Sequence, residues 1–183
     1  RIEYASTIIK VVKNYVYEEN NLLNDKLYIN ILDICKNLCK TYNYISSIND
    51  SHDLISYLML LMNTECAKTL SKYNDGIYRS AELNKISNTE NFSPEIFDFI
   101  KIWKSTSGSY SLFNNRKKHE LIHSPDYYVH ITSPIRRLVD LLNIIKIQEH
   151  LLLFKMSNDA SLFYEKWIKK IEYINEKMTN IRK

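Results

Sequence analysis

The chain has 183 residues, 45% of them apolar and 25% charged, which is ordinary globular usage and excludes a disordered tail or a fibrous repeat. Its net charge of +4 is by itself a weak indication of a nucleic-acid partner. The sequence has no apolar run of the roughly 18 residues that a membrane span needs and no secretory signal pattern, so we expect a cytoplasmic protein without membrane contact.

The length suits one compact domain, and no shift in composition marks a domain boundary. The first residue is Arg1 rather than Met, so we expect residues 1–183 to be a single domain or a part of one. The three cysteines, Cys35, Cys39 and Cys66, have no C-x-x-C spacing and are expected to be buried free thiols.

Strands and then helices are predicted for the first 44 residues. Residues 1–16 are rich in β-branched and aromatic side chains, which predicts one or two strands. A short helix is expected from Tyr17. From Lys26 to about Tyr44 apolar residues recur at intervals of three and four, which predicts an amphipathic helix.

The middle of the chain is predicted to be helical with one long loop. Asp50 or Ser51 is expected to cap a helix that ends at residues 74–76. A polar loop follows over residues 81–91. Ser93 then begins a predicted helix, because an N-cap serine precedes a proline and a first-turn acid.

The last third begins with irregular chain that contains a possible strand at residues 110–113. Two long helices are predicted to follow, from Pro134 to about Met156 and from Ala160 to about Asn180. The whole pattern predicts an α+β fold that is mainly helical.

The stretch from Ser133 carries the first chemical prediction. Ser133 is a favoured N-cap and Pro134 a favoured first residue, so a helix is expected to begin there with Arg136 at its third position. That position ordinarily takes an acid, because the helix N-terminus carries a partial positive charge. Arg136, Asp140 and Asn143 then share one helix face. We expect Arg136 to bind a phosphate while Asp140 orients it. Alternatively, this is a surface helix with a chance cap and solvated arginines.

Three weaker candidates for nucleic-acid contact lie close by in the sequence. The basic run Arg116, Lys117 and Lys118 either grips backbone phosphates or is a solvated loop. His130 either orients the phosphate clamp or is a satisfied core histidine. Tyr128 is the tyrosine that we single out for contact with bases.

The same stretch resembles a motif of the ribonuclease II (RNB) family, Tyr-x-His-Phe-Thr-Ser-Pro-Ile-Arg-Arg-Tyr-x-Asp. The residues that match it in register are Tyr128, His130, Thr132, Ser133, Pro134, Ile135, Arg136, Arg137 and Asp140. Weaker similarities occur in the family's order: residues 8–22 resemble the segment after the catalytic centre, residues 51–67 a helix with Met-x-x-x-Asn, and residues 77–79 its Leu-Tyr-Arg. The resemblance spans nearly the whole chain.

This resemblance implies that the chain is the C-terminal portion of an RNB-like domain. Members are hydrolytic exoribonucleases that degrade single-stranded RNA from its 3′ end with magnesium, and Arg136 is implied to be the catalytic residue that contacts the phosphate near the scissile bond. The implied substrate-binding residues are Tyr128, His130, Thr132, Ser133, Arg137 and Asp140. We add Arg116, Lys117 and Lys118 to them because of their charge.

The aspartate cluster that holds the metal in such enzymes is absent from this sequence. No Asp-x-Asp occurs, and the close pair Asp50 and Asp53 is better explained as helix capping. Mg²⁺ is therefore expected only with an upstream half, on the same polypeptide or on a companion chain, and none on this chain alone. The expected partner is single-stranded RNA. The alternative is a catalytically inactive RNB-derived module for RNA binding or for a structural role.

Overall fold

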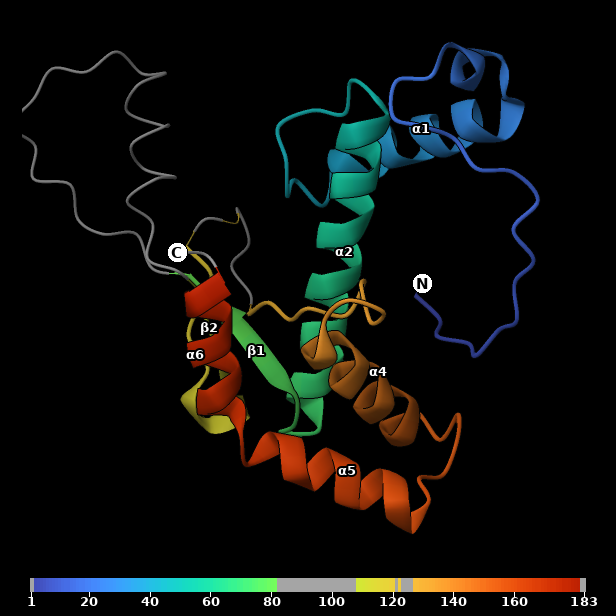
Figure 1. Ribbon diagram of the computed structural model, residues 1–183. Helices are drawn as coiled ribbons and strands as arrows, with labels where there is room; N and C mark the ends of the chain where they lie inside the picture. Colours follow the sequence, from blue (N-terminus) through green and yellow to red (C-terminus); the bar gives the residue numbers. More distant parts are fainter. Residues whose placement is uncertain (1, 82–107, 121, 123–126, 182–183) are drawn as a thin grey trace, which may run out of the picture.

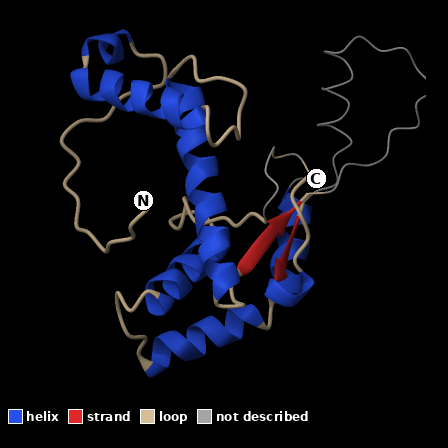
Figure 2. Ribbon diagram, turned by 180° about the vertical axis from the view of Figure 1, so that it is seen from behind, coloured by secondary structure: helices blue, strands red, loops and turns tan. Residues whose placement is uncertain are grey.

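The computed structural model describes residues 2–81, 108–120, 122 and 127–181. They form a mainly helical α+β structure with one small antiparallel sheet, as predicted (Figure 1, Figure 2). The elements are α1 (Lys26–Cys39), α2 (Ser51–Lys72), β1 (Ile77–Ser80), β2 (Ser109–Leu112), α4 (Leu138–His150), α5 (Asn158–Ile168) and α6 (Ile171–Ile181), with 3-10 turns at Asn20–Asn24 and Phe113–Asn115.

Helix α2 is the central element of the structure. Helix α1 contacts one end of it, while α4 and the β1–β2 sheet lie at the other end (Figure 1). Helix α6 contacts β2, and α5 joins α4 to α6 along the edge of the molecule (Figure 1). The part that carries the RNB-like motif therefore lies between α2, α4 and the sheet.

The ends of α2 follow the sequence signals that predicted them. The Asp50 carboxylate accepts a hydrogen bond from the Asp53 amide at 2.8 Å, which is an N-cap. Beyond the helix, Gly76 has a φ of 103°, and a Cβ there would lie 2.8 Å from Leu70 Cδ1. The chain therefore needs glycine to turn from α2 into β1.

Among the described residues, buried apolar side chains form three clusters, one between α1 and α2 and two near the sheet. Cys35 and Cys39 pack with Tyr57 between α1 and α2, and Cys66 lies in the core beside β1. All three cysteines are free and buried, as predicted. Near the sheet, Ile77 packs against Leu142 of α4, which fixes α4 to β1.

Residues 109–112 pair with β1 in antiparallel register, from Ser80 opposite Ser109 to Ile77 opposite Leu112. The strand predicted at residues 110–113 is thus confirmed, with a shift of one residue. On its other side, β1 meets the chain again through an antiparallel bridge from Tyr78 to Val129. This bridge places the start of the motif at the edge of the sheet.

Two elements predicted for the start of the chain differ from the structure. Residues 2–16 contain no strand, and Ile8 and Val12 are fully or almost fully exposed. Strand propensity reflects packing on a pleated surface, and within the described residues this segment pairs with no strand. The predicted short helix after Tyr17 is a 3-10 turn at residues 20–24.

The predicted final helix is divided into α5 and α6. The chain turns at Lys169 and Lys170, and this turn lets α6 leave the line of α5 and pack on β2. Helix α1 also ends earlier than predicted, at Cys39. Both differences show tertiary packing prevailing over local periodicity.

The predicted loop over residues 81–91, apart from residue 81 itself, and the predicted helix from Ser93 lie outside the described residues. Within the residues that are described, no helix has the length and apolar character that crossing a membrane requires.

Candidate nucleic-acid interface

The motif forms a segment from Tyr128 to Arg137, called here the clamp segment. Its first residues extend the sheet: the Arg79 amide donates to the Tyr128 carbonyl at 2.7 Å, beside the Tyr78–Val129 bridge. The strand-like pairing ends after Val129. Figure 1 shows the segment as the gold trace that passes from the sheet into α4.

Two buried asparagines contact the backbone of the clamp segment where the strand pairing ends. Asn63 of α2 accepts from the Ile131 amide at 3.1 Å and donates to the Tyr128 hydroxyl at 2.6 Å. Asn143 of α4 donates to the His130 carbonyl at 3.0 Å and bonds both polar backbone groups of Ile77 at 2.9 Å. Both asparagines are fully buried, so these bonds replace water completely.

The helix start differs from the prediction. Helix α4 begins at Leu138, its N-cap is Arg137 in an extended conformation, and residues 134–136 form a separate turn. The Ser133 carbonyl accepts from the amides of Arg136 and Arg137 at 3.2 and 3.0 Å, which closes this turn. Ser133 is therefore not the N-cap, Pro134 is not the first helical residue, and Arg136 is not the third.

Asp140 takes the third position of α4 and causes this difference. Its carboxylate accepts a hydrogen bond from the Ser133 amide at 2.7 Å, so it holds the turn outside the helix. An acid at this position also suits the positive end of the helix dipole. The prediction that an arginine occupies the third helical position, where its charge would oppose the helix dipole unless a phosphate were bound, is thus wrong.

Asp140 binds Arg137, and not Arg136 as predicted. Arg137 Nε lies 2.7 Å from Asp140 Oδ2, and Arg137 Nη2 lies 2.8 Å from Asp140 Oδ1, which is a bidentate pair. The Asp140 side chain is completely buried, while the Arg137 side chain is 25% exposed. The hydrogen bonds to Asp140 raise the pKa of Arg137 above its ordinary value. The charges of this pair cancel at the base of the turn.

Arg136 lies on the exposed side of the same turn. In the described part of the chain its guanidinium contacts Ser133 Oγ at 3.4 Å, a long and weak hydrogen bond. Because Arg137 is neutralised by Asp140, Arg136 supplies the net positive charge of the turn. Thr132 is exposed beside it, and Ser133 is half-buried. These residues form the accessible face of the clamp segment.

His130 and Tyr128 lie below this face. Tyr128 is buried, and its ring meets the rings of His119 and His130 edge-on. His130 Nδ1 is 2.7 Å from the Tyr110 hydroxyl. Burial, and then the charge of Arg137, lower the pKa of His130 well below its usual value, so the ring is neutral at pH 7. Tyr128 has no accessible ring for a base, which corrects that expectation.

The basic run has two different environments. The Arg116 guanidinium lies 3.7 Å from the centre of the Phe113 ring and 4.4 Å from that of Tyr127, and its Nη1 donates to the Phe113 carbonyl at 2.7 Å. This aromatic cage occupies Arg116 and makes it a packing residue. Lys117 and Lys118 are exposed.

Three residues near the clamp segment were not assigned a role by sequence reasoning: Asn63, Arg79 and Tyr110. Arg79 is buried, with its guanidinium 5.1 Å from the centre of the Tyr110 ring. A Cβ at Gly108 would clash with the backbone carbonyl oxygen of Ser80 as well as with the Arg79 guanidinium, so glycine is required there. In the sequence alone, a buried arginine in a four-residue strand cannot be distinguished from an arginine on the surface.

The described residues do not fit the magnesium site that the resemblance implies. In the part of the chain with described coordinates, ligand atoms of Asp50, His52 and Asp53 lie within 4.8 Å of one another. Asp50 caps α2, and Asp53 Oδ2 accepts from the Asn49 amide at 3.0 Å. A helix N-terminus disfavours a cation, so capping is the better explanation, as predicted.

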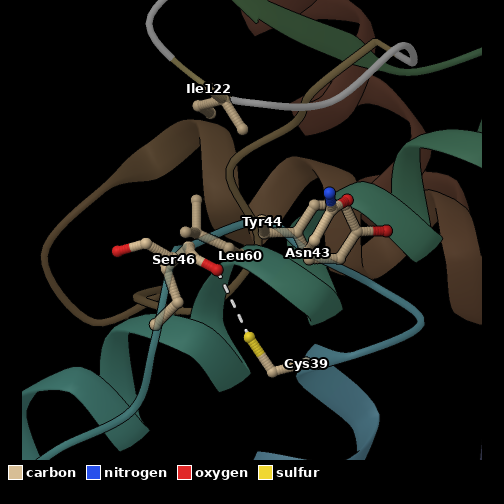
Figure 3. Close-up of a pocket in the computed structure, with 7 residues that line it drawn as sticks. Cys39, Asn43, Tyr44, Ser46, Leu60 and Ile122 are labelled. Carbon is tan, nitrogen blue, oxygen red and sulfur yellow. Dashed lines mark hydrogen bonds between the residues drawn. The ribbon is translucent and has the colours of Figure 1, made fainter.

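A separate cavity of about 700 Å³ lies between the loop after α1 and helix α2 (Figure 3). Tyr44, Leu60 and Ile122 contribute to its walls, and Cys39 Sγ at its edge donates to the Ile45 carbonyl at 3.3 Å. None of the described residues that line it is charged.

Comparison with known proteins adds one likeness. No family model matches the chain, and no curated protein matches it. Among solved structures, the chain is similar to the crystal structure of an active-site mutant of the Dss1 exoribonuclease from Candida glabrata, with 25% identity and a TM-score of 0.48. The overlap covers 67% of this chain and 18% of that one.

Proposed function

We propose that this chain is the RNA-clamping part of an RNB-type exoribonuclease that shortens single-stranded RNA from its 3′ end. The observation that carries the proposal is the exposed Arg136 on a turn fixed by the buried Arg137–Asp140 pair. This arrangement occurs within the nine residues that match the family motif. A guanidinium held on a rigid support can form two parallel hydrogen bonds to a phosphodiester.

The two arginines have separate roles in this proposal. Arg136 binds the phosphate near the scissile bond, because its side chain is exposed. Arg137 and Asp140 hold the turn, because their bidentate bonds and the bond to the Ser133 amide use both carboxylate oxygens. Thr132 and Ser133 line the same face and supply hydroxyl groups to the sugar or phosphate. His130 serves as a neutral support for the segment.

Metal chemistry requires residues beyond the described ones. A catalytic magnesium ion needs converging carboxylates, and Asp140 cannot supply one because three hydrogen bonds from protein atoms already surround it. We propose that the metal site lies on the remainder of the same polypeptide or on a companion chain. An inactive RNA-binding module is the second candidate, favoured by this lack of a fitting carboxylate group among the described residues.

The test is the affinity of the chain for a labelled single-stranded oligoribonucleotide over a series of salt concentrations. Arg136→Ala should weaken binding by about tenfold or more, since a charge-assisted contact contributes about 1.5–3 kcal/mol. Arg136→Lys should restore little of the loss, because an ammonium group lacks the planar fork of the guanidinium.

Lys117→Ala and Lys118→Ala are the matched controls, because both side chains are exposed and basic. Each should cost less affinity and mainly flatten the dependence on salt. Equal losses in the three alanine variants, together with full binding by Arg136→Lys, would show general basicity in place of a clamp. Failure of the wild-type chain to bind RNA would contradict the proposal.

A further inference from the structure

The backbone of the clamp segment is held by side chains rather than by a strand. After the bridge at Val129, the His130 carbonyl bonds to Asn143, the Ile131 amide to Asn63, and the Ser133 amide to Asp140. Each of these three side chains is completely buried and comes from a helix. The segment therefore follows a path that α2 and α4 impose on it.

Burying an amide side chain without hydrogen-bond partners costs about 1–3 kcal/mol. The buried asparagines at positions 63 and 143 must therefore find partners. Asn63 does so with one acceptor bond to Ile131 and one donor bond to Tyr128. Its neighbour Thr64 is equally buried, but its hydroxyl has no partner within the described structure. Of these two buried polar side chains, only that of Asn63 forms hydrogen bonds to the clamp segment within the described structure.

We infer that Asn63 is a positioning residue for RNA binding: through Ile131 and Tyr128 it fixes the path of the chain that presents Arg136 to the phosphate. The inference rests on the proposed function, because it concerns how that arginine is held. Asn63 does not touch RNA, since it is fully buried in α2. Removing the Asn63 side chain should make the turn less ordered, although the Arg136 guanidinium itself is unchanged.

A double-mutant cycle separates positioning from simple stability. The wild-type chain, Asn63→Ala, Arg136→Ala and the double variant are compared by RNA affinity under conditions where urea titrations show all four to be folded. Asn63→Ala should weaken binding by about threefold to tenfold, since positioning cannot cost more than the Arg136 contact that it serves. With Arg136→Ala already present, the same change should cost less than about twofold.

Two further variants make the result decisive. Leu54→Ala removes a buried side chain from the α1–α2 core, and it should lower stability without changing RNA affinity. Tyr128→Phe keeps the buried ring but removes the oxygen that Asn63 binds, so it should fold and give a smaller loss, about twofold to threefold, that also disappears in the Arg136→Ala background.

The outcomes have distinct meanings. Equal losses from Asn63→Ala in both backgrounds, with no effect of Tyr128→Phe, would overturn the positioning role while the clamp stands. The same conclusion follows if Leu54→Ala weakens binding as much as Asn63→Ala. An Arg136→Ala variant that binds like the wild type would instead contradict the proposed function, and the positioning role with it.

Discussion

Two adjacent arginines of the clamp segment have opposite environments. Arg137 binds both oxygens of the buried Asp140 carboxylate, whereas Arg136 extends into solvent from the same turn. Asp140 can reach Arg137 because the helix starts at Leu138, so that Arg137 is the N-cap and Asp140 is the third helical residue. A buried carboxylate needs such a partner, since an unpaired buried charge is strongly destabilising.

The first prediction concerns the two halves of this pair. Arg137→Met should destabilise the chain more than Asp140→Asn does, because it leaves the buried carboxylate unpaired. In Asp140→Asn the arginine still reaches water, and the asparagine oxygen still accepts from Ser133. We expect about 3 kcal/mol for the first change and about 1.5 kcal/mol for the second in urea titrations. A larger loss from Asp140→Asn would contradict this asymmetry.

The second prediction concerns His119, whose ring packs on Tyr128. Burial, and then the charge of Arg79, lower the pKa of His119 to about 4 from its ordinary value of 6.5. Between pH 6.5 and 4 the unfolded chain binds a proton at this residue that the folded chain does not bind. Stability from this residue is present above pH 6.5 and is lost as the pH falls to about 4.

His119→Phe keeps a ring beside Tyr128 and removes this titration. The free energy of unfolding, measured from urea titrations at a series of pH values, should therefore decrease less steeply with acid in the variant than in the wild type. Identical slopes between pH 6.5 and 4 would show that His119 titrates normally.

The clamp residues could be found from the sequence, but their pairing could not. The motif match identified the segment, and the spacing of Asp140 and Asn143 correctly placed polar groups on one face of α4. The choice between Arg136 and Arg137 depends on where the helix begins. That start is set by a hydrogen bond from the Ser133 amide to Asp140, seven residues away, and Ser-Pro signals predict a different start.

At the scale of elements, the helices with strong caps follow the sequence. Helix α2 begins after Asp50 and ends before Gly76, where sequence signals place both boundaries. Residues 2–16 have equally clear strand residues, but strand formation requires a neighbouring strand. The turn between α5 and α6 carries two lysines and no proline or glycine, so only packing on β2 explains it.

The third prediction tests the turn that joins α2 to β1. Gly76→Ala should destabilise the chain by about 1–3 kcal/mol, because alanine is strained at a φ of 103° and its Cβ would meet Leu70. Asn74→Gly is the control: Asn74 is exposed with a φ of 54°, and the change should stay within about 0.5 kcal/mol. Urea titrations measure both. A neutral Gly76→Ala would mean that the turn can rearrange.

At the scale of the whole molecule, the fold class follows from composition and periodicity, whereas the arrangement around the clamp segment does not. Residues 63, 79, 110, 130 and 143 come together from α2, both strands and α4. Local sequence patterns do not indicate which residues from distant parts of the chain become neighbours in the fold. Buried polar side chains decide this arrangement, and in a sequence they look like exposed ones.

The fourth prediction is that residues 1–183 alone do not hydrolyse single-stranded RNA in Mg²⁺ or Mn²⁺. Among the described residues the carboxylates that come together cap a helix, and Asp140 is buried and accepts three hydrogen bonds from protein atoms. Incubation with end-labelled RNA and separation of the products measures this. Metal-dependent shortening from the 3′ end would show that the chain contains a metal site of its own.

The central claim is that Arg136 binds an RNA phosphate from a turn fixed by Arg137 and Asp140. A crystal structure of the chain with a short single-stranded RNA tests it most directly. We predict a phosphate oxygen within about 3 Å of the Arg136 guanidinium nitrogens, with the Arg137–Asp140 pair unchanged. A complex in which the RNA lies on Lys117 and Lys118 while Arg136 remains in solvent would contradict the account.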